Sequence, residues 1–191
     1  MVPTFAESYL GDTNLSSKKF DQLIIIGGAK LDLVIAKSIS ITGPLGASNI
    51  TADAMNITGP ASLKTAKLKE VVITGPVSLT DVTSDTVTIT GYADFTNVTV
   101  AKDLQITGML KANHSIFNTI TLNMSESKIR DSSAKSIAVK RPNSDEPHQK
   151  LRLYGNTYID TIVFESGYGE VHLYGRNIKV GNVKGAEVIQ H

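Results

Sequence analysis

Val71-Val72-Ile73-Thr74-Gly75-Pro76-Val77 is one copy of a motif that recurs between residues 25 and 108. Its centre, Ile-Thr-Gly, occurs five times at intervals of 16, 16, 16 and 17 residues. Self-similarity at a short fixed interval is typical of repeat proteins, in which each unit packs only on its neighbours. The copies begin at Ile41, Ile57, Ile73, Ile89 and Ile106, and a degenerate copy, Ile25-Ile26-Gly27, precedes them.

Apolar residues recur at fixed offsets from the glycine of each copy. Around Gly75 they include Val71 and Ile73 before it and Val77 and Leu79 after it, and a further pair of positions follows seven and nine residues later. Residues two apart on a strand point to the same face. Each unit therefore contains three short strands, and each strand contributes two inward-facing residues.

Three strands in 16 residues leave one to three residues for each corner. This spacing predicts an all-β fold, a single-stranded parallel β-helix (β-solenoid) with three sides and about ten coils of roughly 16 residues. Equivalent strands would stack at about 4.8 Å, which gives a rod about 45–50 Å long. Parallel crossovers are predominantly right-handed, so we expect that hand. Glycine would form one corner, and the proline that follows it in three copies supports a bend there.

The repeat becomes less regular toward the C-terminus. Leu151 and Leu153 are expected to precede a glycine corner at Gly155, and the next pair, Val171 and Leu173, a corner at Gly175. We therefore assign the solenoid to residues 21–191. Residues 1–20 are expected to form an N-terminal cap or leader, and the polar segment 140–150, which contains two prolines, is expected to protrude as a loop.

Composition excludes several functions. The chain has 191 residues, with 19 Lys and Arg against 18 Asp and Glu. This balance lacks the excess of positive charge that nucleic-acid binding requires. It has no cysteine, so disulfides, zinc-thiolate sites and a cysteine nucleophile are excluded. No apolar stretch is long enough for a transmembrane segment.

A leader peptide is not visible at the N-terminus, because no charged segment there is followed by an apolar run. We nevertheless expect an extracytoplasmic protein, whether periplasmic, surface-bound or secreted, with the cytoplasm as the alternative.

The one candidate site is a surface-contact column. Thr42, Thr58, Thr74, Thr90 and Thr107 would stack on the outer surface beside the glycine corner. Stacked threonines also occur on ice-binding solenoids, but those proteins use two such columns and only Thr88-Ile89-Thr90 provides both positions here. High β-propensity on an exposed strand also explains the column.

No catalytic residue, cofactor or metal site is expected, so the protein is not expected to be an enzyme. Its histidines are dispersed over the repeat and have no acid at catalytic or metal-ligand spacing: His114, His148, His172 and His191. His172 is expected to point into solvent. Four tyrosines fall in the C-terminal coils and would form an aromatic patch or pack across coils: Tyr154, Tyr158, Tyr168 and Tyr174.

Two families resemble this sequence. Phe20-Asp21-Gln22-Leu23-Ile24-Ile25-Ile26-Gly27-Gly28-Ala29-Lys30-Leu31, followed by short coils, resembles the opening of bacterial envelope β-solenoids known as adhesin head domains. The Val-x-Ile-x-Gly-x-Val pattern of residues 71–77 also resembles the repeat of bactofilins, which are polymer-forming cytoskeletal solenoids. Bactofilin corners often contain Gly-Asp or Gly-Glu, which are largely missing here.

Three hypotheses remain open, and the first two follow from these resemblances. The first is a non-enzymatic structural or adhesive solenoid of the bacterial envelope, or a secreted one, that presents flat strand faces to a protein or glycan partner. The second is a bactofilin-like scaffold that self-associates through its terminal coils. The third is a carbohydrate-binding module that uses outward Tyr and Asn residues.

Overall fold

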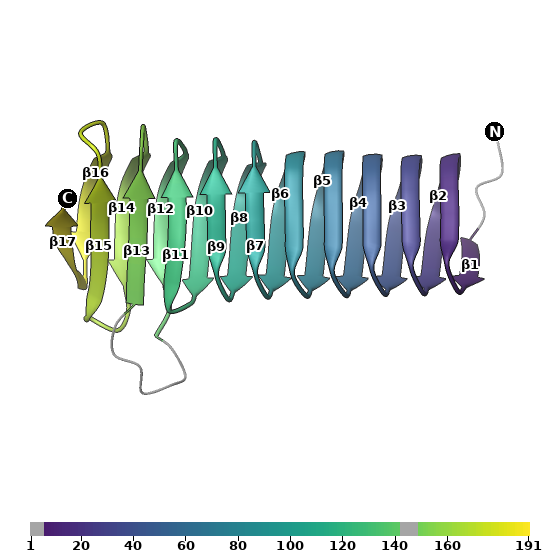
Figure 1. The fold of residues 1–191 in the computed structure, drawn as a ribbon, viewed down its shortest axis with the longest axis horizontal. Helices are drawn as coiled ribbons and strands as arrows, with labels where there is room; N and C mark the ends of the chain where they lie inside the picture. Colours follow the sequence, from purple (N-terminus) through teal and green to yellow (C-terminus); the bar gives the residue numbers. More distant parts are fainter. Residues whose placement is uncertain (1–5, 142–148) are drawn as a thin grey trace.

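The structure is a computed structural model that describes residues 6–141 and 149–191. All elements in this part are β-strands, and all their pairings are parallel (Figure 1). The chain winds into a β-solenoid of about 11 turns of about 16 residues, which confirms the predicted fold class. The turn number slightly exceeds the expected ten because strands near both ends extend the stack.

Seventeen strands make up the rod. They are β1 (Ala6–Leu10), β2 (Thr13–Ile26), β3 (Ala29–Thr42), β4 (Leu45–Thr58), β5 (Ala61–Thr74), β6 (Val77–Thr90), β7 (Ala93–Thr96), β8 (Thr99–Thr107), β9 (Leu110–Asn113), β10 (Ile116–Asn123), β11 (Glu126–Arg130), β12 (Ser133–Val139), β13 (Gln149–Tyr154), β14 (Tyr158–Phe164), β15 (Gly169–Tyr174), β16 (Lys179–Lys184) and β17 (Ala186–Gln190).

The three sides are visible in the burial pattern of the regular turns. In β4, buried residues alternate with exposed ones, and the alternation slips twice, after Ala47 and after Ala52. Each slip turns the chain through a corner, and Gly43 and Gly59 form the third corner at the ends of the strand. Every side therefore directs two side chains inward, as the sequence predicted.

The glycine corner excludes any side chain. Gly59 has φ 138°. A Cβ atom built there would lie 2.5 Å from the carbonyl oxygen of Gly43 in the preceding turn, which is closer than atoms pack. Successive turns therefore approach so closely at this corner that only glycine fits.

A second corner has a backbone conformation that non-glycine residues rarely adopt. Eight such residues have φ between 47° and 56°, each at the same place in its turn: Ser17, Leu33, Asn49, Thr65, Asp81, Asn97, His114 and Asp131. Asn and Asp tolerate this left-handed region, whereas a β-branched residue such as Thr65 does so at a cost. The sequence showed this corner only as a slip in the apolar pattern.

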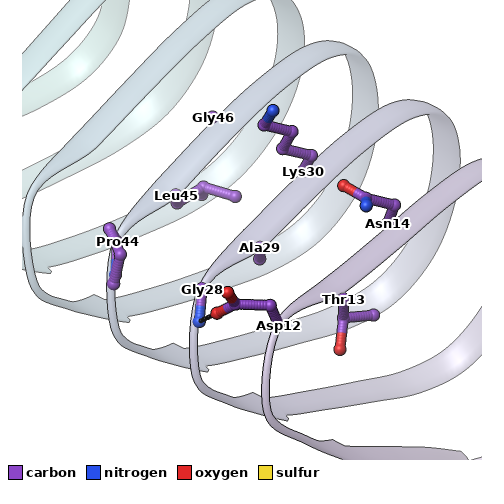
Figure 2. A pocket seen from close by; sticks show the side chains of 9 residues that line it. All are labelled: Asp12, Thr13, Asn14, Gly28, Ala29, Lys30, Pro44, Leu45 and Gly46. Atoms are coloured by element: carbon purple, nitrogen blue, oxygen red, sulfur yellow. Dashed lines mark hydrogen bonds between the residues drawn. The ribbon is translucent and has the colours of Figure 1, made fainter.

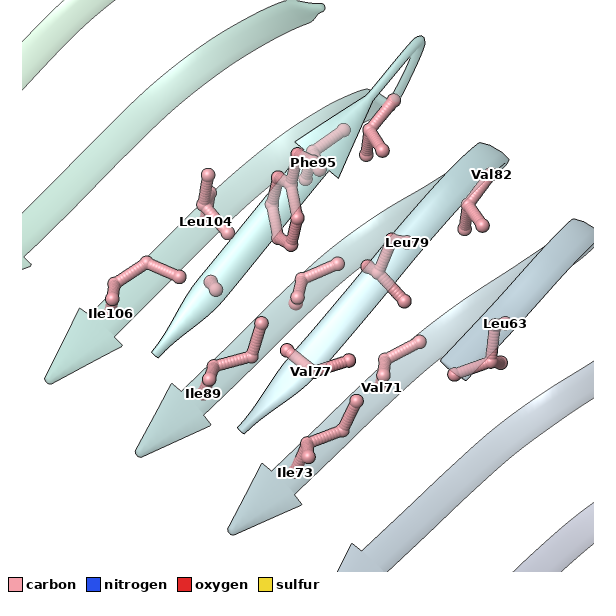
Figure 3. Packing of buried hydrophobic residues seen from close by; sticks show 14 of the residues in the cluster. Leu63, Val71, Ile73, Val77, Leu79, Val82, Ile89, Phe95, Leu104 and Ile106 are labelled. Atoms are coloured by element: carbon pink, nitrogen blue, oxygen red, sulfur yellow. The ribbon is translucent and has the colours of Figure 1, made fainter. Parts of the chain in front are cut away.

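The inward columns form one continuous core along the rod (Figure 3). The apolar residues predicted to face inward from Leu23 to Val100 are buried. Polar residues also enter the interior, and their hydroxyl groups are satisfied by the backbone. Ser84 donates to the carbonyl oxygen of Lys69 or Thr86, and the Oγ of Ser115 accepts a hydrogen bond from the backbone N–H of Val98 at 3.1 Å.

The expected positions of Gly155 and Gly175 are wrong by one corner. Leu151 and Leu153 lie in register with Ser127 and Ile129, and so follow the glycine corner instead of preceding it. Gly155, with φ 64°, continues the column of left-handed residues that ends in the preceding turn. The error arose because each of the three sides presents the same inward pair, so the apolar spacing alone does not identify the corner.

The strand pairing shows no break at residue 20. Ala6–Leu10 pairs with the end of β2, and Thr13 to Ser16 pair with Ala29 to Asp32, so residues 6–20 extend the stack. The loop expected at 140–150 falls mostly on residues 142–148, which lie outside the described part of the chain. The two flanking strands, β12 and β13, continue the regular pairing.

Candidate functional surface

The predicted threonine column forms a straight line on the outer surface of β3, β4, β5, β6 and β8. Thr42, Thr58, Thr74, Thr90 and Thr107 are Cα partners of one another in successive turns, and all five are exposed. Ile26 precedes the column and Asn123 follows it. The column beside it, two residues earlier on each strand, has mixed chemistry: Ser40, Asn56, Val72, Thr88 and Gln105.

A second outer column alternates in charge. It contains Asp21, Lys37, Asp53, Lys69, Asp85 and Lys102, one residue from each of six turns. Lys37, Lys69 and Lys102 pair with the acid of the preceding turn, at N–O distances of 2.7, 2.7 and 2.9 Å. The hydrogen bond that Lys69 donates to Asp53, followed by the negative charge of Asp53, raises the pKa of Lys69 above its ordinary value. Aligning the chain on its glycines would have revealed this column.

Two grooves lie near the glycine corner. The first is lined by Asp12, Thr13, Asn14, Gly28, Ala29, Lys30, Pro44, Leu45 and Gly46 (Figure 2). It exists because Gly28 and Gly46 present no side chain, and the backbone N–H of Gly28 donates to Asp12 Oδ1 at 3.1 Å. The second groove is apolar and follows the exposed residues Pro44, Pro60, Pro76 and Tyr92 along the rod.

Aromatic and histidine rings stack on the outer face of the C-terminal turns. The Tyr154 and Tyr174 rings lie 4.7 Å apart between centroids, and the His191 ring lies 4.3 Å beyond Tyr174. The guanidinium carbon of Arg130 lies 5.0 Å from the Tyr154 ring centroid, on the turn before it. Tyr174 is therefore enclosed between two rings. Tyr158 and Tyr168 remain exposed.

The histidines are less dispersed than the sequence indicated. His172 Nδ1 lies 2.9 Å from His191 Nε2, and His172 Nε2 lies 2.7 Å from Glu170 Oε2. The His172 side chain points outward between Val171 and Leu173, as expected, but it is only 12% exposed, so the expectation that it is solvated is wrong. Its ring lies within the stack that Tyr174 and His191 continue. No sequence pattern predicted this contact, because the two histidines are 19 residues apart in an irregular turn.

The surroundings of Glu170 favour its ionised form. Hydrogen bonds from His172 and from Lys150 hold the pKa of Glu170 below its ordinary value. Lys150 Nζ lies 3.2 Å from Glu170 Oε2. Glu187 is the Cα partner of Glu170 in the next turn.

Clusters of metal ligands are absent from the described ranges. Among residues 6–141 and 149–191, no group of three or more His, Asp or Glu side chains is arranged to hold a metal ion. His114 lies at the left-handed corner, 3.9 Å from Asp131 Oδ2. The same ranges also contain no helix that is long and apolar enough to cross a bilayer.

These features define a parallel β-solenoid with a flat threonine column, an alternating charged column and a C-terminal ring stack. No protein-family model matches the chain, and comparisons with curated proteins and with solved structures also give no match.

Proposed function

We propose that the protein is a non-enzymatic structural or adhesive rod whose flat strand faces contact a protein or glycan partner. The observation that carries this proposal is the exposed threonine column, which stays in register over five successive turns. The regular spacing of identical side chains suits a partner that also presents a repeated surface.

The chemistry of the column supports adhesion. Each threonine offers a hydroxyl group that donates and accepts hydrogen bonds, together with an apolar methyl group. A single contact of this kind is weak. Five contacts on one rigid face act together, because the later contacts form without a further loss of translational freedom.

Adhesion of protein-coated beads to immobilised glycans and matrix proteins tests the proposal. The variant Thr58→Lys, Thr74→Lys, Thr90→Lys places three long charged side chains on the column. The control variant Ser62→Lys, Ser78→Lys, Thr83→Lys adds the same charge at exposed positions on the other two sides. We expect the first variant to lose adhesion and the control to keep it. Equal adhesion of both variants, or no adhesion of the parent, would overturn the proposal.

A self-assembling scaffold is the second candidate, and the last described turn favours it. Val188 belongs to an inward-facing column, in register with Val171, but is 47% exposed. Its strand, β17, pairs with β15 on one side, and the described residues place no strand on the other. A second copy that stacked on this edge would bury Val188 and extend the rod as a filament.

Light scattering and electron microscopy over a concentration series distinguish the two candidates. Filaments that shorten or disappear in Val188→Lys would support the scaffold, with Glu187→Lys as the control at an outward position of the same strand. A monomer at all concentrations would eliminate it. Filaments would in turn eliminate a discrete adhesin.

A carbohydrate-binding module is less well supported. Sugars stack on exposed ring faces, whereas the faces of Tyr174 are covered by neighbouring rings. Tyr92, Tyr158 and Tyr168 are the exposed tyrosines that such a module would use.

The proposed compartment is extracytoplasmic, with the cytoplasm as the alternative. The absence of cysteine is compatible with an oxidising environment, where free thiols would cross-link. Fractionation of the source cells, followed by immunoblotting beside a cytosolic marker, tests this proposal. Recovery of the protein with the cytosolic marker would overturn it.

A further inference from the structure

The C-terminal end of the rod presents apolar side chains. Val180, Val183 and Val188, one from each side of the coil, continue inward columns whose preceding members are completely buried. No strand of the described ranges lies beyond them, and Val188 is 47% exposed. This end therefore leaves core residues and the backbone edges of β16 and β17 open to solvent (Figure 1).

The N-terminal end differs, because two of its inward positions carry charge. Glu7 is the Cα partner of Leu23 and Lys18 that of Val34, and both partners are completely buried. The hydroxyl group of Tyr9 donates to the Glu7 carboxylate, and Lys18 is exposed. An inward-pointing charge on an edge strand disfavours pairing with another chain. The first described turn therefore acts as a polar cap.

A head-to-tail contact between two copies would bury this cap. Glu7 lies in the column that ends at Val183, so stacking the first turn of one copy on the last turn of another would place its carboxylate against a valine. Lys18 would also be withdrawn from water. A charge moved into an apolar stack is costly unless an opposite charge pairs with it. Contact between two C-terminal ends buries only valines at these positions.

We propose that the C-terminal end binds the same end of a second copy, so that two rods join end to end about a twofold axis. This assembly rests on the self-association proposed above as the second candidate, but it closes at two copies because each contact surface is used once. The edges of β16 and β17 run antiparallel to those of the second copy, a stable arrangement of strands. The outward side chains of Lys179, Lys184 and Glu187 remain in solvent at the rim.

Single introduced cysteines report which ends meet, because the chain has none of its own. Glu187→Cys places a thiol at the C-terminal end, and Asn14→Cys places one on the same side of the coil at the N-terminal end. After treatment with a flexible bismaleimide, we expect cross-linked dimers from Glu187→Cys and none from Asn14→Cys. A cross-link that forms only when the two variants are mixed would show a head-to-tail contact and overturn the proposal.

Sedimentation velocity over a concentration series measures the pair directly. We expect the parent chain to reach a dimer and Val188→Lys to stay a monomer. Glu187→Lys, at an outward position of the same strand, is the control and should still form the dimer. Circular dichroism checks folding, and Val188 is exposed enough that its substitution leaves the core intact. A parent chain that stays monomeric, or that forms filaments, would overturn the proposal.

Removal of the charges from the N-terminal cap tests why assembly stops at two. Glu7→Leu with Lys18→Val makes both ends apolar, so we expect assemblies larger than the dimer. The control, Ser8→Leu with Lys19→Val, adds the same side chains at adjacent outward positions and should remain dimeric. Equal sizes of the two double variants would overturn the role of the cap. Bead adhesion reports the threonine column separately, so the failure of either proposal is distinguishable from that of the other.

Discussion

Lys69 Nζ lies 2.7 Å from Asp53 Oδ1, on the turn stacked directly before it. The pair belongs to the alternating column in which every Lys has an Asp in the turns before or after it. A misfolded stack that skipped one turn would place Asp beside Asp and Lys beside Lys. The column therefore disfavours wrong pairings between turns that otherwise have nearly identical inward residues.

Reversal of the charge at position 69 tests this role. Lys69→Glu would place three acids in successive turns, so we expect a lower melting temperature at low salt. Lys67→Glu is the control, because it makes the same charge change on the same strand beside Thr51 and Thr83, which are uncharged. Salt at about 1 M, with a screening length near 3 Å, should reduce the difference between the variants. Equal melting temperatures at low salt would contradict the prediction.

The glycine corner is expected to reject alanine. In Gly75→Ala, the new Cβ atom would lie 2.5 Å from the carbonyl oxygen of Gly59, in a backbone conformation with φ 138°. We expect the free energy of unfolding to fall by about 2–4 kcal/mol, as measured by chemical denaturation.

Gly46→Ala is the matched control for the glycine corner. A Cβ atom at Gly46 meets nothing within 4 Å, and its φ lies outside the left-handed region. Since glycine weakens a strand interior, this variant should gain about 0.5 kcal/mol. A similar loss in both variants would show that glycine is needed for another reason than close approach.

The left-handed corner offers a site for stabilisation. Thr65 has φ 54°, which a β-branched side chain adopts unfavourably, whereas Asn49 and Asn97 occupy the same place in other turns. Thr65→Asn should therefore raise the free energy of unfolding by about 1 kcal/mol. Lys64→Asn, at the adjacent exposed position, should have little effect. A loss of stability in Thr65→Asn would mean that the threonine side chain makes a contact that offsets the backbone cost.

The sequence predicted those features that every turn repeats. Ile41, Ile57 and Ile73 occupy one inward column because the same burial requirement applies in each turn, and repetition makes the pattern visible. The glycine corner was predicted for the same reason. The left-handed corner was not, because Leu33, Thr65 and His114 share a backbone conformation but no side-chain chemistry.

Features that depend on irregular turns were also missed. The contact between His172 and His191 depends on the register of β15 and β17, which the apolar spacing did not determine. The buried hydroxyl group of Ser115 was missed because serine at an inward position becomes favourable only when a backbone N–H of the neighbouring turn, here that of Val98, needs an acceptor. The candidate threonine column needed only the repeat interval, so its alignment could be predicted.

The difference between neighbouring positions on one strand provides the most direct test of the winding. Ile73 is 1% exposed and lies in the core, whereas Thr74 faces solvent. Ile73→Asp would bury a carboxylate among aliphatic side chains, so we expect the free energy of unfolding to fall by more than about 3 kcal/mol. Thr74→Asp should change it by less than about 0.5 kcal/mol, since surface substitutions rarely do more. Because a shift by one residue would exchange the two faces of the strand, similar effects of the two substitutions in denaturant titrations would contradict the inward assignment.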